Sequence, residues 1–273
     1  MRLINQRPGP GTRLFLGAVP FAVLAGVYAV ASHLRLAENP AEKVLPSLDA
    51  MAAAFARMAF EPDQRSGDYL LWTDTALSLM RLGAGIGVST LAALAFGIAI
   101  GFVPRARATV APFVAAVSLI PPITVLPILF IAFGLGETAK IALIVVGTAP
   151  VMIRSVAQAV MEIPEEQIVK AETLGASTWQ LALRVVLPQT LPRLIDALRL
   201  NMGAAWLFLI AAEAIASTQG LGYRIFLVRR YLAMDVILPY VAWITLIAYG
   251  LDRVLLVASK RLFAWAHLKG DAL

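Results

Sequence analysis

Side chains that commonly carry catalysis are scarce in this chain of 273 residues. It has no cysteine and only two histidines, His33 and His267, which lie far apart in the predicted topology. Ser89 and Ser118 have no histidine partner, and we interpret both as helix-packing residues. The residue types therefore argue against a metal site, thiol chemistry and a serine hydrolase, and we expect a non-enzyme.

The chain also lacks a nucleotide-binding loop. The glycines between Gly83 and Gly87 are not followed by the Gly-Lys-Ser/Thr of a phosphate-binding loop. We therefore expect this chain to bind no cofactor itself.

Glu213 lies in the apolar sequence Ala-Ala-Glu-Ala. An ionisable group at membrane depth is a candidate for function, here in a translocation pathway. The alternative is an interfacial acid paired with Arg224 or Arg230, and the sequence leaves both open.

Prolines interrupt another apolar segment, where Pro121, Pro122 and Pro127 follow Ser118 within ten residues. Each removes a backbone donor and frees a carbonyl group. Such a break marks either a translocation path or a plain kink, and we expect Pro121 and Pro122 to line the path.

The composition indicates the elements that position these residues. Hydrophobic residues make up 60% of the chain and charged residues 15%, against about 45–50% and about 25% in soluble proteins. The excess falls in blocks long enough to cross a bilayer as helices. A soluble enzyme and a disordered chain are excluded. The net charge of +6 flanks these blocks, so it indicates orientation in a membrane rather than nucleic-acid binding.

The blocks predict an all-α membrane protein with about six transmembrane helices. The predicted spans are 14–32, 78–103, 109–133, 139–160, 194–217 and 236–258. Asp252 and Arg253, adjacent in the last span, should point to different faces and pair with other spans or reach the inner interface. Small residues four apart, Gly83 with Gly87 and Gly97 with Gly101, predict close helix packing.

Lys and Arg in the short flanks predict that both termini are cytoplasmic. Arg2, Arg7 and Arg13 precede the first span, which we interpret as uncleaved rather than as a signal peptide because further spans follow. Arg105 and Arg107 agree with this orientation, whereas a loop with Arg224, Arg229 and Arg230 opposes it.

Two long connections separate the spans. Residues 33–77 are predicted outside, with an amphipathic helix after Ser47 that either lies at the outer surface or covers core. Residues 161–193 are predicted inside as a helix, a stop at Gly175 and a second short helix opened by Ser177 and ended by Pro188 and Pro192. Ile168, Ala171 and Leu174 form one apolar stripe on the first of these helices.

The stretch Lys170-Ala-Glu-Thr-Leu-Gly-Ala-Ser-Thr-Trp-Gln180, followed by Val185-Val-Leu-Pro188, resembles the signature loop of permease subunits of bacterial ATP-binding-cassette importers. Segments such as Ala211-Ala-Glu213 and Gln219-Gly-Leu-Gly-Tyr223 are similar to the nitrate/sulfonate/taurine branch, and the resemblance covers about residues 45–262. The chain departs from the family's Glu-Ala-Ala at Val169 and Lys170.

The resemblance implies a type I importer permease fold in the bacterial inner membrane. It divides the chain into a first helix with a periplasmic segment (1–77), a core (78–262) and a cytoplasmic tail (263–273). It implies a second permease copy, most simply as a homodimer, membrane lipid, a periplasmic or lipid-anchored substrate-binding protein, and a separate ATPase that carries ATP and Mg. The residues implied to dock the ATPase and couple it to transport are Glu166, Lys170, Ala171, Glu172, Thr173, Leu174, Gly175, Ala176 and Ser177.

The resemblance also implies a small polar or anionic solute. The alternatives are a secondary transporter or channel without an ATPase, which predicts inverted repeats that the sequence does not show, and a membrane scaffold.

Overall fold

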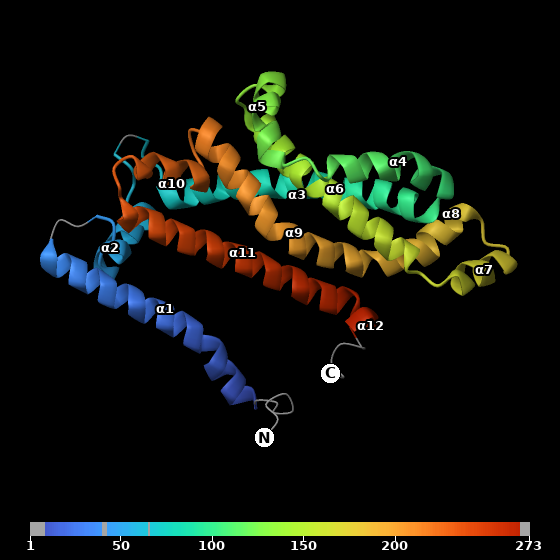
Figure 1. Ribbon diagram of the computed structural model, residues 1–273, viewed down its shortest axis with the longest axis horizontal. Helices are drawn as coiled ribbons and strands as arrows, with labels where there is room; N and C mark the ends of the chain where they lie inside the picture. The colour runs from blue at the N-terminus through green and yellow to red at the C-terminus, as the bar shows by residue number, and fades with distance from the viewer. Residues whose placement is uncertain (1–8, 40–42, 65, 268–273) are drawn as a thin grey trace. The chain divides into compact units, whose positions relative to one another are not determined.

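A computed structural model describes residues 9–39, 43–64 and 66–267 (Figure 1). Arg2 and Arg7, used above for orientation, and the tail beyond His267 lie outside the described residues. The described residues form helices joined by short turns. These are α1 (Pro10–Glu38), α2 (Leu48–Phe60), α3 (Leu70–Phe102), α4 (Pro104–Val117), α5 (Pro122–Phe133), α6 (Glu137–Met161), α7 (Glu165–Thr173), α8 (Thr178–Leu181), the π-helical turn η2 (Ala182–Val186), α9 (Leu187–Ala216), α10 (Leu221–Arg229), α11 (Met234–Leu262) and α12 (Ala264–His267).

Five of these helical segments are long and apolar enough to cross a membrane, and there are six if the bent pair of α4 and α5 is counted as one span. The expectation of an all-α protein with about six spans is confirmed. α3 begins eight residues before the predicted start at 78, because Asp74 lies inside the helix. Two short helices, α10 and α12, were not predicted from the sequence.

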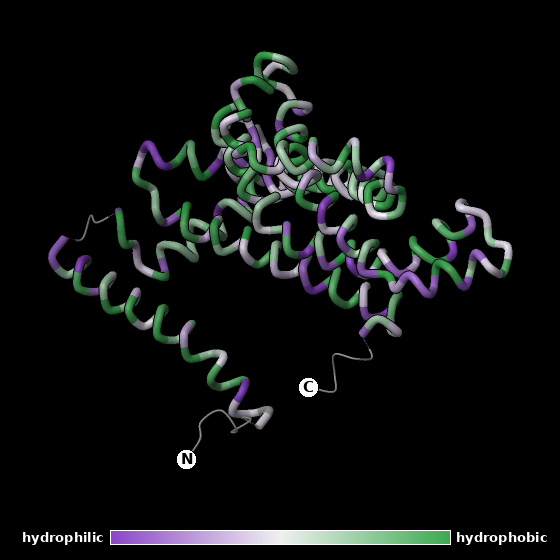
Figure 2. Tube along the Cα trace, turned by 45° about the vertical axis from the view of Figure 1, so that its right-hand side comes forward, coloured by the Kyte–Doolittle hydropathy of each residue, from purple (hydrophilic) through white to green (hydrophobic). Residues whose placement is uncertain are grey.

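The chain divides into two compact units. The first holds α1 and α2 with Val228–Val241. In it Ser32 donates from Oγ to the carbonyl oxygen of Pro46 at 3.0 Å, and Ser47 caps α2, as the sequence predicted. α1 is apolar along most of its length (Figure 2), and none of its most apolar 18-residue window is buried.

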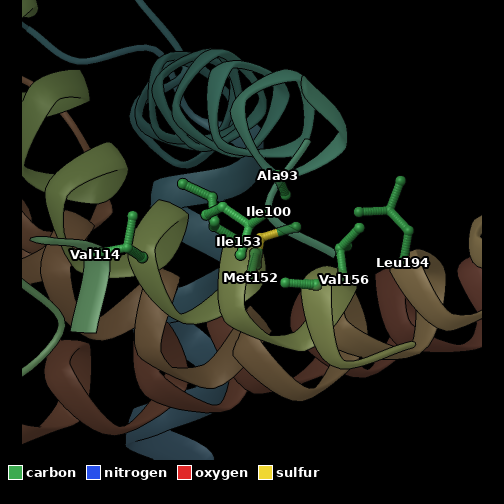
Figure 3. Packing of buried hydrophobic residues seen from close by; sticks show 8 residues of the cluster. Ala93, Ile100, Val114, Met152, Ile153, Val156 and Leu194 are labelled. Atoms are coloured by element: carbon green, nitrogen blue, oxygen red, sulfur yellow. The ribbon is translucent and has the colours of Figure 1, made fainter. Parts of the chain in front are cut away.

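The second unit holds Leu70–Leu227 with the remainder of α11 and with α12. Its core is a packed pair of helices, α3 and α6, joined by α9 and α4 (Figures 1 and 3). The buried side chains of this core are Ala93, Ile100, Val114, Met152, Ile153, Val156, Ala157 and Leu194.

Glycines allow α3 and α6 to approach closely. A Cβ atom on Gly97 would lie 2.7 Å from Val156, and one on Gly101 would collide with Val160. The predicted packing role of this pair is confirmed. Gly83 and Gly87 have open space instead, and Gly85 makes the contact, against Ile144. The prediction for the first pair is wrong because the packed face of α3 passes through Gly85.

Candidate functional site

Glu213, near the end of α9, has no solvent-exposed surface. Its carboxylate accepts hydrogen bonds from Ser78 Oγ at 2.8 and 3.0 Å, from Arg81 Nη1 at 2.7 Å and from the Gly222 backbone N–H at 2.8 Å. All of these groups are donors. The predicted pairing with Arg224 or Arg230 is therefore wrong, because Arg81 of α3 takes that place. The assignment of Glu213 to a translocation pathway stays a prediction.

Arg81, which contacts Glu213, also contacts Glu137 at the start of α6. Its guanidinium holds Glu137 through two bonds, Nε to Oε2 at 2.5 Å and Nη2 to Oε1 at 2.9 Å. Lys140 Nζ also contacts Glu137 Oε1, at 2.9 Å. The remaining Arg81 contact goes to the carbonyl oxygen of Gln219, at 2.9 Å.

Three successive backbone N–H groups at the start of α10 donate hydrogen bonds to side chains of α3 and α9. Gly220 donates to Asp74 Oδ1 at 2.8 Å, Leu221 to Ser78 Oγ at 2.9 Å and Gly222 to Glu213 at 2.8 Å. Oxygen acceptors at a helix N-terminus satisfy donors that have no partner within the helix. Gly220 has φ of +127°, and a Cβ there would lie 2.6 Å from the Glu213 carboxyl, so only glycine fits.

Arg224 completes this group by donating to Asp74 Oδ2 at 2.8 Å. We call the set the Glu213 cluster; its acids and bases are equal in number, and its members are Asp74, Ser78, Arg81, Glu137, Lys140, Glu213 and Arg224. Because the carboxylates are held by bases, the cluster suits a structural tie between α3, α6, α9 and α10. Within the described residues, no group of three or more potential ligands could hold a metal ion.

The proline-rich segment breaks the third span. α4 and α5 meet at 96° across residues 118–121, and Figure 1 shows α5 turning away from α4. The carbonyl oxygen of Pro121, the residue before α5, accepts from the Thr124 backbone N–H at 3.0 Å and from Thr124 Oγ1 at 2.7 Å. Pro121 is exposed and Pro122 half-buried, while Pro127 lies inside α5.

Arg154 of α6 reaches this break, where its Nη1 donates to Ser118 Oγ at 2.9 Å. The sequence interpretation did not single it out. The signal was present, since Arg154 is a charged residue inside the predicted span 139–160.

The segment predicted to couple transport to ATP hydrolysis has the expected local structure. α7 starts with Glu165 and Glu166, Gly175 has φ of +86°, and Ser177 forms a capping box with Gln180. No residue of α7 is buried, and Leu174 and Trp179 are 81% and 72% exposed.

The prediction that Pro188 and Pro192 end the second short helix is wrong. α8, η2 and α9 form one continuous helical segment from Thr178 to Ala216. Pro188 is the second residue of α9 and follows the π-helical turn by one residue. A proline ring clashes with the carbonyl four residues earlier in an α-helix, and the wider π turn removes that clash.

Asp252 of α11 pairs with Arg199 of α9, with Oδ1 2.8 Å from Nε. This confirms the expectation that it contacts another span. Arg253 lies over the ring of Tyr249, 4.8 Å from the centroid.

Comparison with known proteins identifies the family of this chain. Residues 89–264 match the family described as "Binding-protein-dependent transport system inner membrane component". The chain is 37% identical over 199 residues to the taurine transport system permease protein TauC of Escherichia coli strain K12, covering 72% of each chain. It is 29% identical to the nitrate import permease protein NrtB of Leptolyngbya laminosa, covering 76% of this chain and 72% of the relative.

A chain of the inward-facing MetNI methionine ABC transporter superposes with a TM-score of 0.54 at 23% identity, covering 67% of this chain and 92% of that chain. This likeness supports the fold alone. Together with the membrane helices, the family match shows that the chain belongs to the inner membrane components of binding-protein-dependent transport systems and is a multi-pass permease subunit of an ATP-binding-cassette importer.

Proposed function

We propose that this permease forms, with a second copy, the pathway of an ATP-driven importer for a small anionic or polar solute. A substrate-binding protein delivers the solute at the outer face, and a separate ATPase with ATP and Mg acts at the inner face. Both termini are cytoplasmic in this arrangement. The relatives named for taurine, nitrate, aliphatic sulfonates and bicarbonate support the solute class.

The observation that carries the proposal is the continuous helical segment Thr178–Ala216. At one end it follows the exposed turn at Gly175, and at the other it holds Glu213 inside the cluster that fixes α3, α6 and α10. Its 39 residues correspond to about 58 Å at 1.5 Å per residue. Movement of the turn is therefore transmitted along one helical element to the opposite end of the bundle.

The docking surface is the exposed face of α7 with the turn after it. Val169 and Leu174 are 48% and 81% exposed, and apolar side chains in this setting favour a protein partner over water. Ile168 and Ala171 are half-buried, so only Leu174 of the predicted stripe is fully available. The residues proposed to dock the ATPase and couple it to transport are Glu166, Lys170, Ala171, Glu172, Thr173, Leu174, Gly175, Ala176 and Ser177.

The test compares two substitutions at one position. Gly175 has positive φ and open space around it, so Gly175→Val strains the backbone whereas Gly175→Asn is tolerated. We expect the valine variant, and Leu174→Asp, to lose copurified ATPase or to uncouple hydrolysis from uptake in proteoliposomes. The asparagine variant should behave like the unmodified chain. Normal copurification, hydrolysis and uptake in both Gly175→Val and Leu174→Asp would remove the support for this docking surface.

A further inference from the structure

The Met161 end of α6 presents polar side chains on a membrane-spanning helix. Arg154, Ser155 and Gln158 are exposed, and Gln158 lies one turn after Arg154, while the opposite face packs into the core. Arg154 is seven residues from Met161, about 10 Å along a helix axis. It therefore lies within the span rather than at its tip.

The neighbouring helix differs at the same depth. The close contacts of Gly97 with Val156 and of Gly101 with Val160 show that α3 and α6 are parallel and keep the same register along this part of the pair. At the level of Arg154 the exposed face of α3 carries Phe96, which is 51% exposed. Apolar residues suit contact with lipid, whereas charged residues in spans face the bundle interior or a water-filled space. The polar face of α6 thus borders a polar space.

The contacts of Arg154 leave most of its guanidinium unused. Nη1 donates to Ser118 Oγ at 2.9 Å, and Ser118 Oγ in turn donates to the carbonyl oxygen of Ala115 at 2.8 Å. Arginine has five N–H donors, so four have no hydrogen-bond acceptor among the residues that the structure describes. Within the described residues Arg154 has no carboxylate partner, in contrast to Arg81 and Arg199, which are held by acids.

We infer that Arg154, oriented by Ser118 at the break between α4 and α5, binds the oxyanion group of the solute as it crosses the membrane. The planar guanidinium matches two oxygens of a sulfonate, nitrate or bicarbonate through parallel N–H bonds. The adjacent exposed Pro121 places the irregular backbone of the break on the same path. This inference rests on the proposed import function and adds the residue that selects for negative charge.

A lipid phosphate offers the same chemistry as a solute oxyanion. The two sources differ in what surrounds position 154. A cysteine there reacts with charged, water-soluble thiol reagents only if the position faces a water-filled path. A side chain that reaches from hydrocarbon to a headgroup leaves an unreactive thiol after truncation.

The experiment uses Arg154→Cys in this chain, which has no cysteine of its own. The variant is assembled with its ATPase and binding protein in proteoliposomes, and uptake of taurine, an aliphatic sulfonate and nitrate is measured. We expect kcat/KM for uptake to fall at least about 10- to 100-fold, which is the effect of losing one of the two charge-assisted hydrogen bonds proposed for the guanidinium. Aminoethyl methanethiosulfonate, which restores a cation, should recover uptake, and the sulfonatoethyl reagent should not.

Three controls complete the design. Phe96→Cys, at the same depth on the apolar face, should not react with either reagent. The unmodified permease, treated in the same way, corrects for thiols on the partner proteins. Arg154→Lys should keep partial uptake, and copurified ATPase reports assembly of every variant.

Failure of Arg154→Cys to react in an assembled complex would assign the arginine to lipid phosphate and overturn the inference. Reaction without a difference between the two reagents would overturn it as well. Absence of ATP-driven uptake by the unmodified complex, for every anion, would instead refute the proposed function. These outcomes are separable because each variant is compared before and after modification.

Discussion

Replacing Glu213 by glutamine tests whether the Glu213 cluster ties the helices together. The carboxylate faces only donors, from Ser78, Arg81 and Gly222. A glutamine must direct its NH2 group at one of them. The less costly orientation points the amide nitrogen at the Gly222 N–H, because the alternative points it at the guanidinium.

The magnitude follows from these contacts. Glu213→Gln removes the hydrogen bond that the carboxylate accepts from the Gly222 N–H and places the glutamine NH2 group against that N–H. It also leaves Arg81 with a single carboxylate partner, Glu137. Losing a charge-assisted bond and one member of a buried ion pair costs about 2–4 kcal/mol in the free energy of unfolding. For a chain of this size we expect a fall in the unfolding midpoint of about 4–7 °C.

Unfolding is measured by heating the protein and following the reaction of a buried thiol, which becomes accessible to the reagent only when the protein unfolds. Ser89→Cys introduces a nearly isosteric, fully buried cysteine into a chain that has no other. The control is Asp252→Asn, which breaks an ion pair whose side chains are 23% and 31% exposed. Because both side chains are partly exposed, solvent screening makes the expected loss of stability smaller than that of Glu213→Gln.

Equal midpoints for Glu213→Gln and Asp252→Asn would refute the structural role. An unchanged midpoint with lost uptake would assign Glu213 to the pathway instead. Loss of both stability and the assembled complex is the result expected from the buried contacts.

Two further predictions concern topology and packing. Single cysteines at Ser66 and Thr218 should label from outside with an impermeant thiol reagent and one at Thr178 only from inside; the reverse pattern would overturn the orientation. Gly147→Leu should prevent folding because a Cβ there collides with the Phe208 ring, whereas Gly83→Leu, in open space, should leave the folded yield in detergent unchanged. Equal yields would show that the two positions are packed alike.

Apolar length predicted the spans well, because a helix in lipid must satisfy its own backbone hydrogen bonds. The predicted boundaries failed where a charge or proline lies inside a helix. Asp74 concealed the start of α3, and Pro188 suggested an end where a π turn lets the helix continue. Local signals such as the stop at Gly175 and the cap at Ser177 were sufficient by themselves.

The site was less predictable, because its contacts join residues far apart in the sequence. Glu213 was recognised as unusual, but nothing near it in sequence indicates that Arg81 is its partner. Arg154 was overlooked, although its charge inside an apolar block was visible. What the sequence does not contain is the distance from Arg154 to Ser118, 36 residues away.

The long separation within the Glu213 cluster has a consequence for synthesis. Arg81 and Glu213 are 132 residues apart. At about 5–20 residues per second, Arg81 exists for roughly 7–26 s before its buried partner is made. Glu137, 56 residues after Arg81, is the earlier partner. Exposing an unpaired arginine to hydrocarbon is costly, so we expect the Arg81 end of nascent α3 to stay in a polar environment until α6 has been made. The rate of synthesis would then set when this end of the helix can be buried, and we expect a chain truncated before Glu137 to remain associated with the insertion machinery.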